Sequence, residues 1–227
     1  NLMDTASAVS SYDSNSLNEL GIDNALDLAD HTPSLTVAPS RVSIRGVGRQ
    51  NLALGSDPGV GLYWDGVYTT ETDLFNYSNF FDIERIEVVR GPQGTLYGRN
   101  SIGGAVNLSS IKPNNEEWGG KLNGEYGNYN YWTAQGLASG PLTDKLSVLV
   151  AASQIKRDGF QTDVITDKEY DDKDVTYGTI AFEHQTTDRW TNSLKVIDAK
   201  SDNHQSPGYI LSPYNTDYVQ EVFNASG

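Results

Sequence analysis

Histidines, acidic runs and serines are the residues of this sequence that could bind a metal or act on a substrate. His31, His184 and His204 are far apart and lack the short spacing of metal-ligand sets. The acidic run Glu169–Asp174 could hold calcium, but it lacks the glycine and distal glutamate of an EF-hand, so a solvated loop is the better interpretation. No Gly-x-Ser-x-Gly nucleophile motif is present. We therefore expect no metal site, no cofactor and no enzymatic activity.

The glycine-rich segments do not match nucleotide-binding motifs. Gly91–Arg99 lacks the Gly-Lys-Ser/Thr ending that places a lysine on a phosphate. Gly46-x-Gly48 and Gly59-x-Gly61 lack the third glycine of a dinucleotide fingerprint. The net charge of −14 disfavours nucleic acid as a partner of the whole molecule. The absence of cysteine excludes disulfides and thiolate metal sites.

Two arginines stand at equivalent positions, each at the end of a predicted strand. Arg45 and Arg90 each end a strand-like run, Val42–Arg45 and Ile83–Arg90, and each is followed directly by glycine. A glycine at this point permits a tight corner in the backbone. On an open surface an ion pair of either arginine would contribute at most ~1 kcal/mol, whereas a partly desolvated site would make it worth much more.

The part of the chain before Lys112 mixes short helices with strands. Capping-box spacing at Ser16–Glu19 predicts a helix that Gly21 ends, and Ala25–Asp30 predicts a second helix that ends before Pro33. Asp65-Gly66 predicts a tight turn. The predicted strands are Val9–Tyr12, Leu35–Val37, Val42–Arg45, Val60–Trp64, Ile83–Arg90 and Ala105–Ser109.

The part after Trp118 consists of strands and turns, with no apolar run of the ~20 residues that a membrane helix needs. The predicted strands are Gly119–Gly127, Tyr131–Ser139, Leu146–Lys156, Val175–Gln185 and Trp190–Ala199. Their alternation predicts an outward apolar face of Leu122, Tyr126, Trp132, Val148, Val150, Leu194 and Val196. The inward face should carry Lys121, Glu125, Thr133 and Gln135. A soluble β-sandwich is the alternative, but it would place polar groups outward.

Three ordered motifs carry a resemblance to a known family. They are Ser43–Gly48, Asp57–Tyr68 and, most strongly, Ile83–Leu108. They resemble the plug signature of TonB-dependent outer-membrane receptors. The resemblance implies an α+β plug domain followed by antiparallel strands of a transmembrane β-barrel, which has 22 strands in the full-length family. We expect the plug at residues 1–115 and the first, incomplete portion of the barrel at residues 116–227. We interpret the chain as a fragment.

The resemblance also implies a function: active import of a scarce solute across the outer membrane of a Gram-negative bacterium, with the plug gating the barrel. An iron–siderophore complex is the expected substrate; carbohydrate or another nutrient is the alternative. The expected partners are the TonB-ExbB-ExbD complex, the small-molecule ligand and outer-membrane lipid. The coupling box, the TonB box, would lie ahead of Asn1.

By the same resemblance, Arg45 and Arg90 lock the plug by pairing with glutamates of the inner barrel wall, beyond Gly227. We expect the ligand at the extracellular plug apices, in the connections Arg49–Ser56 and Thr69–Asp73 and the turn Arg99–Asn100. The candidate ligand-facing residues are Arg49, Gln50, Asn51, Thr70, Glu71, Arg99 and Asn100.

Overall fold

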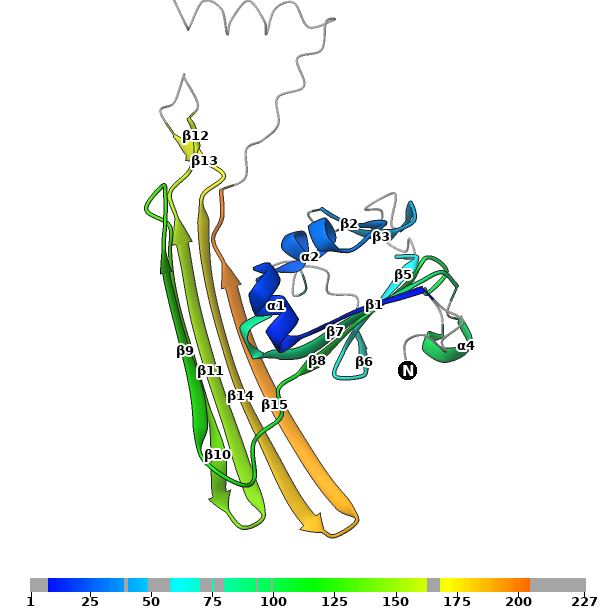
Figure 1. The fold of residues 1–227 in the computed structure, drawn as a ribbon, viewed down its shortest axis with the longest axis vertical. Helices are drawn as coiled ribbons and strands as arrows, with labels where there is room; N and C mark the ends of the chain where they lie inside the picture. Colours follow the sequence, from blue (N-terminus) through cyan, green and yellow to red (C-terminus); the bar gives the residue numbers. More distant parts are fainter. Residues whose placement is uncertain are drawn as a thin grey trace, which may run out of the picture.

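A computed structural model describes residues 8–38, 41–48, 58–69, 75, 80–92, 94–98, 100–162 and 168–204. The chain forms two separate five-stranded sheets (Figure 1). One is the centre of a mixed helix-and-strand unit, and the other is a tall wall of long antiparallel strands beside it. The α+β unit followed by antiparallel strands is the fold class that the sequence predicts. We call the first unit the plug and the second the strand wall.

The plug is built on a sheet with the strand order β1-β7-β8-β5-β6. Its strands are β1 (Ala8–Asp13), β5 (Val60–Trp64), β6 (Val67–Thr69), β7 (Ile83–Arg90) and β8 (Gly104–Ser110). The pair β5–β8 is parallel and the other pairs are antiparallel. A smaller sheet contains β2 (Leu35–Ala38), β3 (Arg41–Ile44) and β4 (Val47–Gly48). Asp65 and Gly66 both have positive φ, which is the geometry of the tight turn that the Asp-Gly pair predicts.

The plug helices are short and are fixed by their caps. They are α1 (Ser14–Leu20), α2 (Ala25–His31), α4 (Gly94–Tyr97) and the 3₁₀ turn η2 (Phe80–Asp82). Helix α1 starts three residues earlier than the capping-box spacing suggests, because Asp13 rather than Ser16 caps it and accepts from the Ser16 N–H. Gly21, with φ 65°, ends α1 as expected. No helix in the described ranges is long and apolar enough to cross a membrane.

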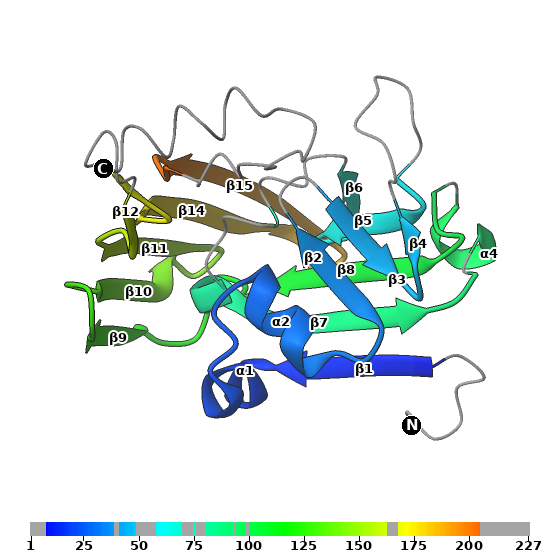
Figure 2. The same ribbon diagram turned by 90° about the horizontal axis from the view of Figure 1, so that it is seen from above.

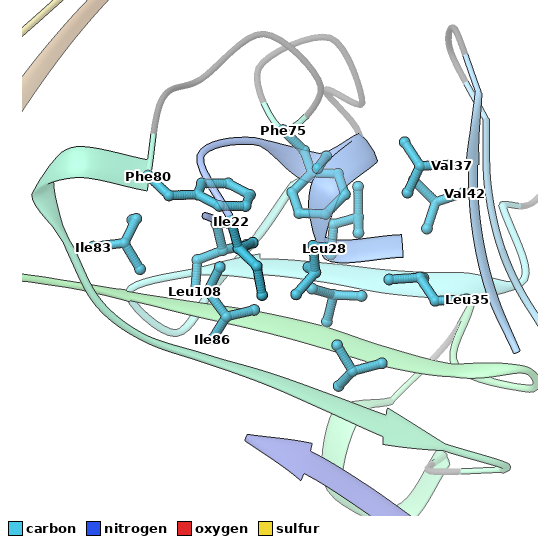
Figure 3. Close-up of a cluster of buried hydrophobic side chains, with 14 of the residues drawn as sticks. Ile22, Leu28, Leu35, Val37, Val42, Phe75, Phe80, Ile83, Ile86 and Leu108 are labelled. Carbon is cyan, nitrogen blue, oxygen red and sulfur yellow. The ribbon is translucent and has the colours of Figure 1, made fainter. Parts of the chain in front are cut away.

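The plug core lies between its main sheet and the helices α1 and α2 (Figure 3). Ile22 and Leu28 come from the helical side, and Ile86 and Leu108 from β7 and β8. All four side chains are at most 1% exposed. The core therefore depends on the alternation along β7 and β8, which turns every second side chain toward the helices.

The strand wall has the order β15-β14-β11-β10-β9, so that each strand pairs with its neighbour in an antiparallel meander. The strands are β9 (Gly119–Tyr126), β10 (Trp132–Thr143), β11 (Leu146–Arg157), β14 (Lys173–Thr187) and β15 (Trp190–Ser201). The short turns β10–β11 and β14–β15 lie at one end, and the small hairpin of β12 (Gln161–Thr162) and β13 (Glu169–Tyr170) lies at the other (Figure 1). The sequence predicted all five wall strands but missed this hairpin.

The two faces of the wall are largely as the alternation predicts. Leu122 is 89% exposed on the outer face, and the Lys121 ammonium lies 4.3 Å over the ring of Phe81 in the plug. Thr133 and Gln135 are buried on the inner face. Val148 differs from the expectation, since it is only 8% exposed.

The burial of Val148 has a local cause. It lies opposite Gly140 and Phe182, and the Trp118 ring lies so close to Gly140 that a Cβ there would be 2.3 Å from it. Neighbours on its own face thus cover Val148.

Gly104 gives a test of the plug fold. Its φ is 147°, and an added Cβ would lie 2.2 Å from the Val89 carbonyl oxygen and 2.9 Å from Ile44 Cδ1. We expect Gly104→Ala to destabilise the plug by more than ~1 kcal/mol, because both the backbone angle and the space exclude a side chain. The measurement is protease resistance of the plug in the full-length receptor as urea is raised.

The matched control is Gly94→Ala, because an added Cβ at Gly94 meets nothing within 4 Å. Equal urea sensitivity of the two variants would contradict the role given to Gly104.

Candidate functional site

A polar cluster around a buried carboxylate joins the plug to the strand wall. We call it the Lys195 cluster; it consists of Trp64, Asp65, Asp82 and Ser110 from the plug and Tyr177 and Lys195 from the wall. The Lys195 Nζ lies 3.5 Å from Asp65 Oδ2 and 3.7 Å from Asp82 Oδ2, and it donates a hydrogen bond to Ser110 Oγ. The ammonium also lies 5.3 Å from the centre of the Trp64 ring. One wall cation is therefore shared by two plug carboxylates.

Strand register brings the plug members of the cluster together. Ile83 pairs with Ser110, so Asp82, the residue before Ile83, lies beside the end of β8. Trp64 pairs with Leu108, so Asp65, the residue after Trp64, reaches the same end. The Ser110 N–H and hydroxyl donate to the two Asp65 carboxylate oxygens at 2.7 and 2.9 Å, and the Trp64 indole N–H donates to Ser110 Oγ at 2.9 Å. Contacts within the plug thus hold the Asp65 carboxylate independently of the wall.

The wall contacts Asp82 through two side chains. The Tyr177 hydroxyl donates to Asp82 Oδ2 at 2.9 Å, and Lys195 lies near the same oxygen. Asp82 is 1% exposed, and its Oδ1 has no hydrogen-bond partner among the described residues. Burial raises the pKa of Asp82, while Lys195 and Tyr177 act in the opposite direction. This carboxylate depends on the wall for its stabilisation.

The two arginines singled out by the sequence lie close to one another at the other end of the plug sheet. A Cβ on Gly91, the residue after Arg90, would lie 3.6 Å from Arg45 Nη1. The Arg90 Nε donates to the Ala8 carbonyl at 3.4 Å. Figure 2 shows the Arg90 end of β7 pointing away from the strand wall. Within the described ranges neither arginine forms an ion pair.

Of the predicted ligand-facing residues, only Asn100 lies in the described part of the chain. Arg49, Gln50, Asn51, Thr70, Glu71 and Arg99 lie outside the described residues. Asn100 is 8% exposed, and its Nδ2 donates to the Tyr68 hydroxyl at 2.8 Å. Its side chain is therefore a packing contact with β6 in this structure, and its role toward a ligand stays a prediction.

Sequence reasoning missed the Lys195 cluster, although one signal pointed to it. The alternation along Trp190–Ala199 places Lys195 on the inward face. A lysine facing a filled interior needs a counter-ion. The partners, Asp65 and Asp82, are more than a hundred residues away in the chain, so no local pattern relates them to Lys195.

A second polar contact lies where β14 begins and β15 has ended. The His204 Nδ1 lies 3.0 Å from Asp172 Oδ2, and the His204 N–H donates to the other oxygen of that carboxylate. The Asp171 N–H in turn donates to the His204 carbonyl at 2.6 Å. The hydrogen bond that the His204 ring donates to the Asp172 carboxylate raises the pKa of His204, with the charges of Asp172 and Asp202 adding to the effect and Lys168 opposing it.

Comparison with known proteins identifies the family. Residues 1–105 match the family model described as the TonB-dependent Receptor Plug Domain. The chain therefore carries a TonB-dependent receptor plug domain in its first 105 residues. The members of this family are receptors and transporters of the Gram-negative outer membrane, and the outer membrane is the location of this receptor.

Similar proteins extend the match beyond the plug. The vitamin B12 transporter BtuB of Vibrio vulnificus is 28% identical over 143 residues, which are 61% of this chain and 23% of BtuB. The ferric enterobactin receptor of Pseudomonas aeruginosa is 31% identical over 138 residues, 55% of this chain and 18% of that receptor. This chain thus spans about a quarter of the length of such relatives or less.

A solved structure shows the same fold. The ferric yersiniabactin uptake receptor FyuA from Yersinia pestis superposes with a TM-score of 0.66 at 22% identity, covering 78% of this chain and 29% of FyuA. The plug and wall of this receptor therefore have the arrangement of a TonB-dependent receptor.

The His204–Asp172 pair predicts a pH dependence. A histidine whose pKa is raised in the folded state stabilises it below its ordinary pKa of about 6.5 and loses this effect as the pH rises through the raised value. We therefore expect amide exchange at residues 171–174 to be slow near about pH 6 and to accelerate at alkaline pH, beyond the intrinsic pH effect on exchange. Hydrogen-exchange mass spectrometry of the full-length receptor measures this.

Asp172→Asn should remove the additional pH dependence, whereas Asp188→Asn, in the short turn at the other end of the wall, should leave it intact. An unchanged profile in Asp172→Asn would refute the assignment.

Proposed function

We propose that this receptor actively imports a scarce solute across the outer membrane, with the plug gating the lumen of a barrel that the strand wall begins. The observation that carries the proposal is a family plug domain fastened to the inner face of the wall by Lys195 and Tyr177. The TonB-ExbB-ExbD complex is the proposed energy source, because a plug held this way needs applied work to move. The proposal includes no enzymatic activity.

We further propose an iron–siderophore complex as the substrate. The support is sequence similarity to a protein named as a ferric enterobactin receptor, at 31% identity. Vitamin, carbohydrate or another nutrient is the second candidate, favoured by the similarity to a vitamin B12 transporter at 28% identity. A soluble β-rich binding module is disfavoured by the exposed apolar outer face, on which Leu122, Leu194 and Val196 are all more than half exposed.

The domain boundary and the ligand-contacting residues are also part of the proposal. Residues 1–115 would be the plug and residues 116–227 the start of the barrel. The proposal is supported by the end of β8 at Ser110 and the start of β9 at Gly119, which lie on either side of this boundary. The apical residues Arg49, Gln50, Asn51, Thr70, Glu71 and Arg99 would contact the ligand. They supply charges and hydrogen-bonding groups of the kind that orient a ligand in a concave site.

Substrate uptake tests the function. Cells that carry the full-length receptor as their only ferric-siderophore receptor should take up radioactive iron from one of a panel of siderophores, and deletion of TonB should abolish uptake. Arg49→Ala with Gln50→Ala should lower whole-cell affinity for that siderophore about tenfold or more if both contact it directly, since each lost charged or polar contact is worth roughly 1–3 kcal/mol.

Asn100 stays unchanged in this test, because its buried hydrogen bond to Tyr68 would confound the result. Glu19→Ala, in helix α1, serves as a surface control. No TonB-dependent uptake of any siderophore, with uptake of cobalamin instead, would move the receptor to the second candidate.

The arginine lock gives a separate prediction. We propose that Arg45 and Arg90 pair with acidic residues of the barrel wall opposite the described strands. Removing one partner of a desolvated pair can cost ~3–5 kcal/mol. Arg45→Ala with Arg90→Ala should therefore loosen the plug and admit large antibiotics such as vancomycin, measured as growth inhibition. Arg41→Ala with Arg189→Ala is the control, and equal resistance of the two double variants would count against the lock.

A further inference from the structure

We propose that the Lys195 cluster is a second plug–barrel fastening, of opposite charge polarity to the arginine pair, in which one wall lysine holds two plug carboxylates and keeps the lumen closed. The inference rests on the proposed gating function and adds to it the residues that hold the near end of the plug. At this end the plug supplies the acids and the wall supplies the base.

Three separate plug segments converge on the one wall lysine. Asp65 lies in the β5–β6 turn, Asp82 ends η2, and Ser110 ends β8. The side chains of all three contact Lys195, so a displacement of the plug sheet along the wall breaks all three contacts at once. A contact that served the plug alone would not need a residue from β15.

Burial makes the fastening strong. The side chain of Lys195 is 19% exposed, that of Asp65 is 40% exposed and that of Asp82 is 1% exposed. Because water reaches Asp82 so poorly, the ammonium and the Tyr177 hydroxyl supply the solvation that the carboxylate loses on burial. Moving the plug away from the wall would therefore take from the Asp82 carboxylate the two groups that stabilise its charge.

The position of the cluster complements that of the arginines. The cluster lies at the Ile83 end of β7, against the wall, and Arg90 lies at the opposite end of the same strand, away from the wall (Figure 2). A plug held at only one end of its sheet could tilt about that point. Fastenings at both ends of β7 prevent the tilt.

The apolar surroundings support the same docking. Ile197, two residues after Lys195 on the inner face of β15, packs against the plug core. On the other side of Asp82, Phe81 lies beneath the Lys121 ammonium of β9 at 4.3 Å. The η2 segment thus contacts the wall through Phe81 as well as through Asp82.

The test uses the full-length receptor in cells that lack TonB and receive no substrate, so that only resting closure is measured. Lys195→Met leaves the Asp65 and Asp82 carboxylates without their cation. We expect at least a tenfold rise in vancomycin entry, and removal of one partner of a buried pair can shift an equilibrium by roughly a hundredfold. The matched control is Lys200→Met on the same strand, because Lys200 is exposed and should leave closure unchanged.

A rescue variant separates charge from packing. Lys195→Met combined with Asp82→Asn removes the buried carboxylate that lost its partner, so entry should fall back toward the wild-type level. If Lys195→Met lowers receptor abundance in the membrane, the same rescue is read as restored abundance by surface labelling. Entry equal to that of Lys200→Met at equal abundance, or no rescue by Asp82→Asn, would overturn the proposal.

The result is independent of the substrate. If the receptor shows TonB-dependent uptake but Lys195→Met does not change resting entry, the proposed fastening is refuted and the proposed transport function stands. If Lys195→Met leaks but the receptor shows no TonB-dependent uptake, the fastening stands and the transport function is refuted.

Discussion

A half-buried ammonium shared by two carboxylates, one of them fully buried, joins the two parts of this receptor. Asp82 is 1% exposed, and the groups that contact its Oδ2, the Tyr177 hydroxyl and the Lys195 ammonium, both come from the strand wall. The plug folds its sheet so that Asp65, Asp82 and Ser110 meet at one end, and the wall completes the site. Because a buried charge without its partner is strongly unfavourable, this contact favours the observed position of the plug against the wall.

The docked plug also explains the side chains on the inner face of the wall. A lumen filled only with water would favour polar residues throughout. Instead Leu149, Ala151 and Ala181 form an apolar cluster on this face, against Leu137 and Ile111, the first residue after β8. These positions pack against the segment that leaves the plug, whereas Thr133 and Gln135 keep the polar character expected of the face. The occupant of the lumen decides which inward positions are apolar.

The acids of the Lys195 cluster and the two candidate lock arginines lie at opposite ends of β7. The carboxylates of Asp65 and Asp82 lie at the end of β7 that contacts the wall. Arg90 ends the same strand at the end that points away from the wall, and Arg45 Nη1 lies near Gly91, the next residue. A sheet with acids at one end and bases at the other can be held by a wall with complementary charges on opposite sides. This arrangement fits a plug that must stay seated at rest and be released only by applied work.

The sequence alone indicated most of the long strands, the first two helices and the family resemblance. Alternation predicted β7 with the bounds Ile83–Arg90, the Asp65-Gly66 pair predicted its turn, and the inward direction of Lys121 followed from strand period. These features depend on local backbone geometry and on neighbours within a few residues. The cap of α1 was assigned to the wrong residue because Ser16 and Asp13 both have capping side chains, and only the folded backbone shows which one accepts from the helix N–H. Val148 was assigned to the exposed face because alternation gives the direction of a side chain but not what covers it. The Lys195 cluster, and the burial of Asn100 against Tyr68, were decided by tertiary structure, since strand register and the docking of the plug bring together groups that no sequence spacing relates.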